Sequence, residues 1–493
     1  MLEKTKALHL SNRLGFGPAP GDLARIADSG FDNYIQTQLH PQITTLPEDV
    51  AVKLRSLPSF GKDCATLYAQ YWWKAQVPGH RSVSPEEKQK LKGHERHVLR
   101  EAQIARLARA VGSPWQLQEA LVEFWFNHFN VYHKKGPVRV WIGAYEEEAI
   151  RPYTLGKFSE ILFATAKHPA MLVYLDNAKN VAPAAAGDAT DEMTAGDGST
   201  GKKKKERGIN ENYAREVMEL HTLGVNGGYS QADVVALAHI LTGWTLGPGG
   251  EADAAAIYKM YGKNKGAFRF SRGEHDASQE ELLGRTFSGG DIGEGEQALL
   301  MLARHPATAH HISYQLAQYF IADAPDSALV ADMAKAFRTS DGDIRTVVHT
   351  MFTHPSFLAP ANIGTKYKTP YGYIVSAARA AGIGVGHIEK LNGALTDLGQ
   401  PLYGCVSPDG YACTQAAWLD ANGLLHRISF AIDFGNGVYS GFGSNGDFDA
   451  PDPGRILQAI GPALSKKTLN VALAAPAANR TGAIVGSPDF MRC

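Results

Sequence analysis

The densest group of chemically active side chains lies between Arg207 and Trp244, in the stretch RGINENYAREVMELHTLGVNGGYSQADVVALAHILTGW. A short part of it holds three glutamates, an arginine and a histidine: Glu211, Arg215, Glu216, Glu219 and His221. Carboxylates that lie close together repel one another and need a cation, a shared proton or good solvation. Such a group suits acid/base catalysis or metal binding, and it equally suits a solvated network of surface ion pairs.

Helical geometry limits which of these side chains can act together. If residues 210–224 form one helix, Glu216 and Glu219 share a stripe because residues three apart are neighbours on a helix. His221 would then point nearly the opposite way, so this helix alone does not assemble a Glu216–Glu219–His221 ligand trio. Arg215 would flank the carboxylate stripe.

A surface ladder is the alternative interpretation of the same spacing. Glu211, Arg215 and Glu219 follow one another at i, i+4 intervals, which allows ion pairs along one helix face. The functional interpretation instead makes Glu216 and Glu219 an acid/base or metal-binding pair.

A second helix is expected to pack against the first. Gly224 to Ser230 form a turn, and Ser230 with Asp233 has the spacing of a capping box. The apolar residues from Val234 to Leu241 then recur at helical intervals. The whole unit is predicted to be an αα-hairpin.

Two further segments carry candidate residues. Asn127 and His128 lie in FWFNHFNVYH, where His128 falls on the apolar stripe of a predicted helix that starts at Ser113 and Pro114. His275 and Asp276 are adjacent in a predicted loop, and loops often carry sites. The chain has no GxSxG, HExxH, Walker or GxGxxG pattern, which argues against the common serine hydrolases, zincins, nucleotide hydrolases and classical dehydrogenases.

Helical periodicity dominates the remainder, so we expect a mainly α protein: one large helical domain of αα-hairpins over residues 1–493, with long loops and at most a small β-hairpin near Phe268. Residues 178–208 are poor in large apolar side chains and are predicted to form a flexible insertion. Its lysine run, Lys202–Lys205, is either a solvated patch or part of a flap beside a site. Residues 385–493 are predicted to be a loop-rich C-terminal portion.

Composition excludes several classes of protein. The formal net charge of -1 over 493 residues gives no argument for a nucleic-acid partner. No apolar run is long enough to span a membrane, and the N-terminus lacks an apolar signal core. The four cysteines are too few for a disulfide scaffold, although Cys405 and Cys413 bracket a turn-rich loop that a disulfide could close.

The chain resembles the bacterial family of domains of unknown function 1800 (DUF1800). The resemblance rests on SNRLGFGP (Ser11–Pro18), EFWFNHFNV (Glu123–Val131), the Asn210–Trp244 stretch, the His275–Asp276 pair, the His305–Asp323 segment, and LGQPLY with PDGY and WL (from Leu398 to Leu419). It implies a helical, usually exported protein, hence a periplasmic or secreted one, often encoded beside sulfatase-like partners. It implies no particular reaction.

Three functions compete. In the first, a hydrolase acts on a polysaccharide or oligosaccharide without a cofactor, since glycoside cleavage needs two carboxylates. Its catalytic candidates are Glu216, Glu219, Asp276 and Glu211, with Asp233 as a further partner. Its substrate-binding candidates are Asn210, Asn212, Tyr213, Arg215, Asn127, His128, His275 and Trp244, and Trp125 and Tyr229 are added as stacking surfaces, although core packing is favoured for Trp125.

In the second, Glu216, Glu219, His128 and His275 hold a divalent metal between helices. In the third, a non-catalytic envelope or assembly protein uses the motif as a buried polar network. This third hypothesis predicts Arg215 fully paired with Glu211 and Glu219, and no cleft.

Overall fold

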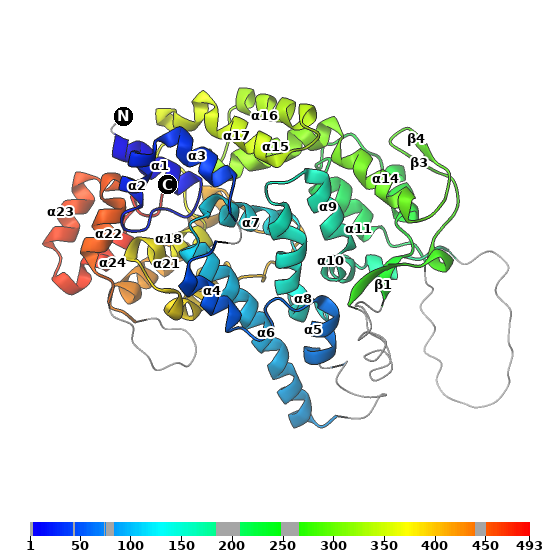
Figure 1. Cartoon of the computed structure of the whole chain (residues 1–493), viewed down its shortest axis with the longest axis horizontal. Helices are drawn as coiled ribbons and strands as arrows, with labels where there is room; N and C mark the ends of the chain where they lie inside the picture. The colour runs from blue at the N-terminus through cyan, green and yellow to red at the C-terminus, as the bar shows by residue number, and fades with distance from the viewer. Residues whose placement is uncertain are drawn as a thin grey trace.

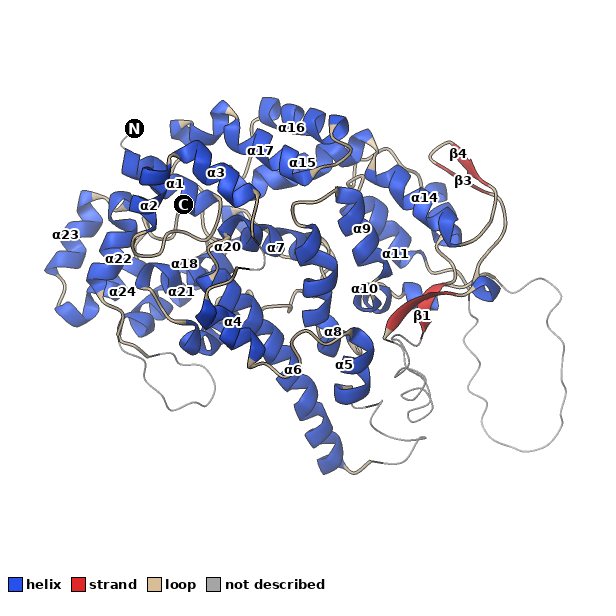
Figure 2. Cartoon of the chain, viewed as in Figure 1, coloured by secondary structure: helices blue, strands red, loops and turns tan. Residues whose placement is uncertain are grey.

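The computed structural model describes residues 3–42, 45–72, 74, 83–183, 208–247, 266–438 and 450–493. Helices make up most of this part of the chain, and four short strands lie near one end of the molecule (Figure 2). The mainly α prediction is therefore confirmed. Most of the predicted flexible insertion, residues 184–207 with Lys202–Lys205, lies outside the described residues.

The N-terminal helices lead into one long helix that runs away from the body of the molecule (Figure 1). These elements are α1 (Glu3–Arg13), α2 (Asp22–Ser29), α3 (Phe31–Leu39), α4 (Glu48–Arg55), α5 (Cys64–Tyr71) and α6 (Pro85–Gly112). Ser84 caps α6 by accepting a hydrogen bond from Glu87 N–H, and Pro85 occupies the first turn, where its missing N–H costs nothing.

The centre of the molecule is a set of buried helices that carries Trp125 and Trp141, two of the largest fully buried side chains. It contains α7 (Gln116–His128), α8 (Val138–Tyr145), η1 (Glu146–Ile150), η2 (Arg151–Tyr153), α9 (Phe158–Lys167), α10 (Pro169–Tyr174) and η3 (Asn177–Lys179). Trp125 is fully buried and its indole donates to the carbonyl of Thr154, so the preference for core packing at Trp125 is confirmed. Helix α7 begins at Gln116 rather than at Pro114, because Ser113 ends α6 instead.

The predicted αα-hairpin is present. It comprises α11 (Glu211–Glu216), η4 (Val217–His221) and α12 (Gln231–Ile240). Ser230 accepts from Asp233 N–H while the Asp233 carboxylate accepts from Ser230 N–H, so the predicted capping box is confirmed.

Two small antiparallel sheets follow this hairpin. Strand β1 (Trp244–Gly247) pairs with β2 (Ala267–Phe270), with Trp244 opposite Phe270, as expected near Phe268. After η5 (Arg272–Glu274), β3 (Glu280–Leu282) pairs with β4 (Arg285–Phe287). The second hairpin was not predicted, because three-residue strands are too short to show an alternating pattern.

The C-terminal half is also helical. It contains α14 (Ile292–Ala303), α15 (Pro306–Phe320), α16 (Ser327–Thr339), α17 (Ile344–Thr353), η6 (Pro355–Leu358), η7 (Pro360–Asn362), α18 (Pro370–Ala381), η8 (Val385–Lys390), α19 (Leu391–Asp397), α20 (Gln415–Trp418), α21 (Ala421–Gly435), α22 (Pro453–Ile460), η9 (Gly461–Ala463), α23 (Lys466–Ala474), η10 (Ala477–Asn479) and α24 (Arg480–Val485). Residues 385–493 thus hold several helices where loops were expected, since short helices between prolines and glycines give a weak periodic signal.

Helices α15, α16 and α17 pack on one another along one edge, and α21 packs on α24 at one end of the molecule (Figure 1). The segment just before α18 runs beside the C-terminal residues, as the bridge between Tyr367 and Arg492 shows. Within the described parts of the chain, no helix combines the length and the apolar character that crossing a membrane requires.

Candidate functional site

The central motif changes its helical type at Glu216. Helix α11 ends there, and Val217–His221 continue as a π-helix. At the end of this segment the Thr222 side-chain hydroxyl donates to the carbonyl of Val217. The expectation of one regular helix to Gly224 was therefore wrong in this detail. Single π turns inside helices occur frequently at functional sites, because the extra residue re-aims its neighbours.

Glu216 is a half-buried carboxyl group with an altered acidity. Burial raises the pKa of Glu216, and the negative charges of Glu219 and Asp409 raise it further, while Arg215 opposes them. A carboxyl group that holds its proton longer than usual is suited to act as a general acid.

The predicted ion-pair ladder is incomplete. Arg215 donates to Glu211 Oε2 at 2.9 Å and to Gln231 Oε1 at 2.9 Å. Among the ion pairs of the described residues none joins Arg215 to Glu219, which instead accepts from the hydroxyl of Tyr229 at 3.4 Å. The full pairing of Arg215 that the non-catalytic hypothesis requires is therefore absent among the described residues. The predicted ladder was wrong for the Arg215–Glu219 contact.

Asp409 reaches the motif on a loop that α7 holds in place. The amide of Asn127 donates to Tyr411 O at 2.8 Å and accepts from Tyr411 N–H at 2.7 Å. Asn130 donates to the carbonyl of Ser407 at 2.8 Å. Gly410 has a φ of +73° and packs directly on Asn127, so a larger residue would not fit there.

A cavity of about 150 Å³ opens between α7, η4, α15 and this loop. Its wall consists of Phe124, Asn127, His128, Leu220, Gln315, Gln318, Tyr319, Asp409, Tyr411, Ala412 and Cys413. Leu220 lies four residues after Glu216 on the same continuous helical segment. The cavity wall thus contains Asp409, whose charge acts on Glu216, together with Asn127 and His128, which were candidates from the sequence.

His128 forms part of the wall but is not free to bind a metal. Its Nε2 donates to the carbonyl of His221 at 3.1 Å, and its Nδ1 lies 2.9 Å from the side-chain amide of Gln315. Burial lowers the pKa of His128 to about 3, and the neighbouring His311 adds to this. Burial likewise lowers the pKa of His221. Both rings are therefore neutral at ordinary pH.

These neutral histidines predict a loss of stability in mild acid. The unfolded chain binds a proton at His128 below about pH 6.5, whereas the folded chain does so only near pH 3. The contribution of the neutral His128 ring to the free energy of unfolding is thus complete above pH 6.5. Below that pH it falls by about 1.4 kcal/mol per pH unit. Urea unfolding from pH 7.5 to 4.5 should show this slope, and His128→Gln should reduce it. An equal slope in both proteins would contradict the prediction.

The other predicted ligands and contacts of the motif have structural roles. Asn210 caps α11 through its side chain, and Asn212 donates to the carbonyl of Leu175. Tyr213 and Trp244 are almost completely buried, so neither offers a ring face to a sugar, and the substrate-binding prediction for these two was wrong.

Asp276 and His275 lie in a different cluster. Asp276 accepts from His239 Nδ1 at 2.6 Å, and His275 is buried between the carbonyl of Thr242 and the carboxylate of Glu294. Neither residue is among the charges that act on Glu216. Neither the predicted metal set nor the Glu216–Asp276 pair is therefore brought together.

Two other groups have metal-ligand types within 4.8 Å of one another among the described residues: His239–Asp276–Glu280, and Cys64–Glu148–His168. In the second group His168 Nδ1 accepts from Ala170 N–H, so Nε2 must carry the proton of the neutral ring and cannot bind a metal. Only the first group retains the chemistry of a cation site.

The cysteines of the Asp409 loop are not bridged. Cys405 and Cys413 are both free thiols, and the Cys413 thiol lies 3.8 Å from the side-chain oxygen of Gln318. The loop is held by the asparagine contacts rather than by a disulfide.

Asn127 should therefore be the main anchor of the loop. Asn127→Ala removes two hydrogen bonds and leaves both polar backbone groups of Tyr411 without their partner, a loss of about 1–3 kcal/mol. Urea unfolding should show this loss, and limited proteolysis should cut the 405–413 loop faster. The exposed residue Asn33 gives the matched control, Asn33→Ala, which should change neither. Unchanged cleavage in Asn127→Ala would show that the loop is held by other contacts.

Asp409 was not identified as a candidate from the sequence. Its signal was present, since it belongs to the PDGY segment, whose aspartate and glycine are typical of a tight turn. Its position near Glu216 depends on contacts between segments almost 200 residues apart, which no local pattern reveals.

Comparison with known proteins identifies one family, whose description assigns no function. The family model described as "Protein of unknown function (DUF1800)" matches residues 9–492. No curated protein and no solved structure matches the chain.

Proposed function

The chain belongs to the DUF1800 family, and from the geometry of its site we propose that it is a hydrolase that cleaves glycosidic bonds with paired carboxylates. The observation that carries this proposal is the environment of Glu216. This group is half-buried, its pKa is raised, and it lies within electrostatic range of Asp409, which lines a cavity.

The two carboxyl groups take different roles. Glycoside hydrolysis needs one group that protonates the leaving oxygen and a second that activates water or attacks the sugar. Glu216 is the acid, because its surroundings favour the protonated form. Asp409 is the base or nucleophile, because it is exposed at the cavity and can receive a proton from water.

The cavity wall supports a carbohydrate substrate. Phe124, Tyr319 and Tyr411 supply aromatic surface, and Gln315, Gln318 and Asn127 supply amides. Aromatic faces with a few polar groups are the usual lining of small-molecule sites and suit the mixed polarity of a sugar ring. The family resemblance adds that this activity would be periplasmic or secreted.

The proposal is tested by incubating the full chain with a broad panel of polysaccharides and measuring new reducing ends. Release of oligosaccharides from at least one glycan is the expected result. The same assay with EDTA separates the metal hypothesis, because a purely carboxylate mechanism should retain its rate. If no glycan on the panel is cleaved, the proposal loses its support.

A divalent metal is the second candidate, favoured by the His239–Asp276–Glu280 group. His239 Nδ1 lies 2.6 Å from Asp276 Oδ2 and 3.7 Å from Glu280 Oε1, so one ion could be reached by all three. A nitrogen and two carboxylate ligands suit Zn²⁺ or Mn²⁺. Loss of activity in EDTA, restored by one of these ions, would favour this candidate.

A further inference from the structure

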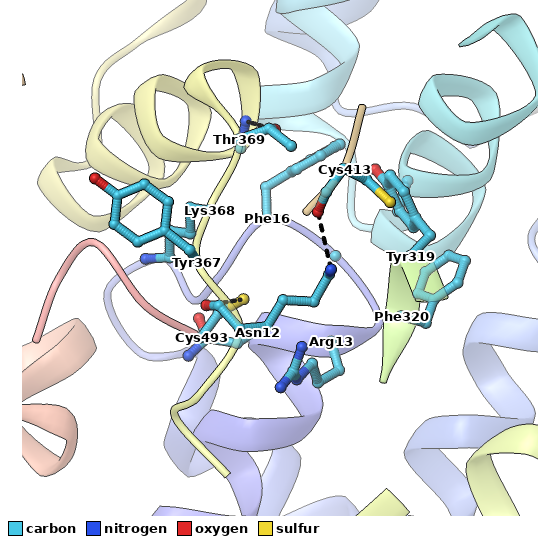
Figure 3. Close-up of a pocket in the computed structure, with 14 residues that line it drawn as sticks. Asn12, Arg13, Phe16, Tyr319, Phe320, Tyr367, Lys368, Thr369, Cys413 and Cys493 are labelled. Atoms are coloured by element: carbon cyan, nitrogen blue, oxygen red, sulfur yellow. Dashed lines mark hydrogen bonds between the residues drawn. The ribbon is translucent and has the colours of Figure 1, made fainter. Parts of the chain in front are cut away.

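A second cavity, of about 60 Å³, lies between the end of α1, the segment that precedes α18, and the end of α15 (Figure 3). Its wall includes three basic side chains, from Arg13, Lys366 and Lys368, together with Tyr319 and Cys413. All three basic residues are less than a tenth exposed. Three buried cations around one small cavity need negative charge nearby.

Arg13 is the least satisfied of the three. Its side chain is 3% exposed, and its Nη2 donates to the carbonyl of Asn362 at 2.6 Å. Its Nε and Nη1 have no hydrogen-bond partner among the described residues. Because a guanidinium stays protonated and buried donors are nearly always paired, these two nitrogens indicate a missing acceptor.

The lysines leave positive charge in the cavity as well. Lys366 is paired with Asp323 at 2.8 Å and also donates to the carbonyl of Cys413 at 2.9 Å. Lys368 donates to the hydroxyl of Ser376 and stacks on Phe490, with its ammonium 4.2 Å from the ring centre. Burial lowers the pKa of Lys368 to about 8, which a bound anion would reverse.

The available negative charge does not satisfy Arg13. Asp323 and Cys493 are the groups whose charge acts on Arg13. Asp323 already accepts from Lys366 and from the backbone N–H of Gln415. The thiol of Cys493 donates to the carbonyl of Lys366. Neither residue accepts a hydrogen bond from the free nitrogens of Arg13.

We infer that this cavity binds an anionic group, a carboxylate, sulfate or phosphate, with Arg13 and Lys368 as its main partners. The volume admits one such group and is too small for a sugar ring with its neighbours. Guanidinium and ammonium groups are the usual partners of these oxyanions.

The anion site adjoins the cavity that Asp409 lines, because Tyr319 and Cys413 line both. The anion can therefore be a free ion or a charged substituent of the substrate. Binding of the anion does not depend on the proposed hydrolysis, so the two can fail separately.

The test measures thermal unfolding of the full chain in sodium chloride and in sodium sulfate at equal ionic strength. Wild type should gain stability with sulfate in a saturable manner. Arg13→Met should lose this gain, and it should match or exceed wild type without sulfate, since it removes an unpaired buried charge. The matched control Arg55→Met, at an exposed arginine paired with Glu48, should keep the full gain.

The dependence of thermal stability on sulfate, compared between wild type and Arg13→Met, distinguishes an anion site from a structural role of Arg13. If Arg13→Met is less stable than wild type by the same amount in both salts, the inference is wrong. Lys368→Met gives an independent arm and should weaken the apparent sulfate affinity at least tenfold; an unchanged affinity would also overturn the proposal.

A further arm identifies the source of the anion. Glucuronate and glucose 6-sulfate are compared with glucose and free sulfate by isothermal titration calorimetry. Binding of the charged sugars at least tenfold tighter than free sulfate supports a substituent of the substrate, whereas equal binding supports a free ion. No binding of any anion overturns the inference, even if neutral glycans are cleaved.

Discussion

Replacement of Glu216 by glutamine is expected to lower kcat/KM on a cleaved glycan by about 10²- to 10⁴-fold, the usual contribution of a positioned general acid. Glutamine keeps the size of the side chain and most of its hydrogen bonding, but it has no acidic proton to give to the leaving oxygen. Because Glu216 is half-buried and takes part in no ion pair among the described residues, thermal unfolding should change little. Initial rates of reducing-end release and a thermal melt measure both quantities.

The pH profile separates the roles of the neighbouring carboxylates. The negative charge of Glu219 raises the pKa of Glu216, so Glu219→Gln lowers it. Glu216 then loses its proton at a lower pH, and the alkaline limb of kcat/KM should move to lower pH while activity persists. Asp409→Asn should move the limb the same way and also remove most of the rate.

Glu211→Gln is the matched control on the same helix. Glu211 pairs with Arg215 and Gln231 and is not among the charges that act on Glu216. This variant should keep both the rate and the pH profile. A loss of activity in Glu219→Gln as large as in Glu216→Gln would transfer the acid role to Glu219, and full activity of Glu216→Gln would exclude the mechanism.

Local patterns predicted the parts of the fold that local physics determines. The capping box at Ser230 and the helix that follows it depend on residues within one turn of each other, and both are present. Trp125 is buried, as the preference for core packing at this residue predicted. The π turn after Glu216 was not predicted, because residues 217–221 have the same composition as an ordinary helix and tertiary packing decides the difference.

The composition of the site depended on long-range contacts. Asp409 approaches Glu216 because Asn127 binds the backbone of Tyr411. The local sequence around Asn127 or around Tyr411 does not reveal this contact. His275 and Asp276 are adjacent in a loop, as predicted, yet His239 draws Asp276 into a separate cluster. Sequence spacing therefore identified side chains able to do chemistry, while their pairing had to come from the structure.

The most destabilising substitution should be at Arg106 in α6. Its guanidinium pairs with Glu123 of α7 and, at 3.2 Å, with Glu146 of η1, and all three side chains are nearly inaccessible to solvent. It also stacks on Phe126 and Tyr403, with ring centres at 5.1 and 5.4 Å. One residue thus joins three helical segments to the loop that leads to Asp409.

The glutamates around Arg106 depend on its charge. Burial raises the pKa of Glu123, and the positive charge of Arg106 opposes this. Glu146 also accepts hydrogen bonds from Arg151 and from the hydroxyl of Tyr403. Tyr403 itself has a backbone φ of +62°, which is unusual for a residue other than glycine. Among the described residues, removal of Arg106 would leave Glu123 with the amide of Gln400 as its one hydrogen-bond partner.

Arg106→Met should therefore lower the free energy of unfolding by about 3–5 kcal/mol, the cost of leaving a buried partner uncompensated. The exposed pair Arg55–Glu48 is the comparison, and Arg55→Met should cost about 0–1 kcal/mol. Guanidinium chloride unfolding at pH 7 measures both values.

The double variant Arg106→Met with Glu123→Gln decides between lost packing and lost charge compensation. If the cost comes from an unpaired carboxylate, neutralising Glu123 should restore about 0.5–3 kcal/mol, and the two substitutions will be strongly non-additive. If the cost comes from lost contacts with the aromatic rings, the double variant will be at least as unstable as the single one. Recovery would mean that the charge balance among α6, α7 and η1 holds the loop of Asp409 in place. Protease should then cleave that loop faster in Arg106→Met than in wild type, and the rate of cleavage should return toward that of wild type in the double variant.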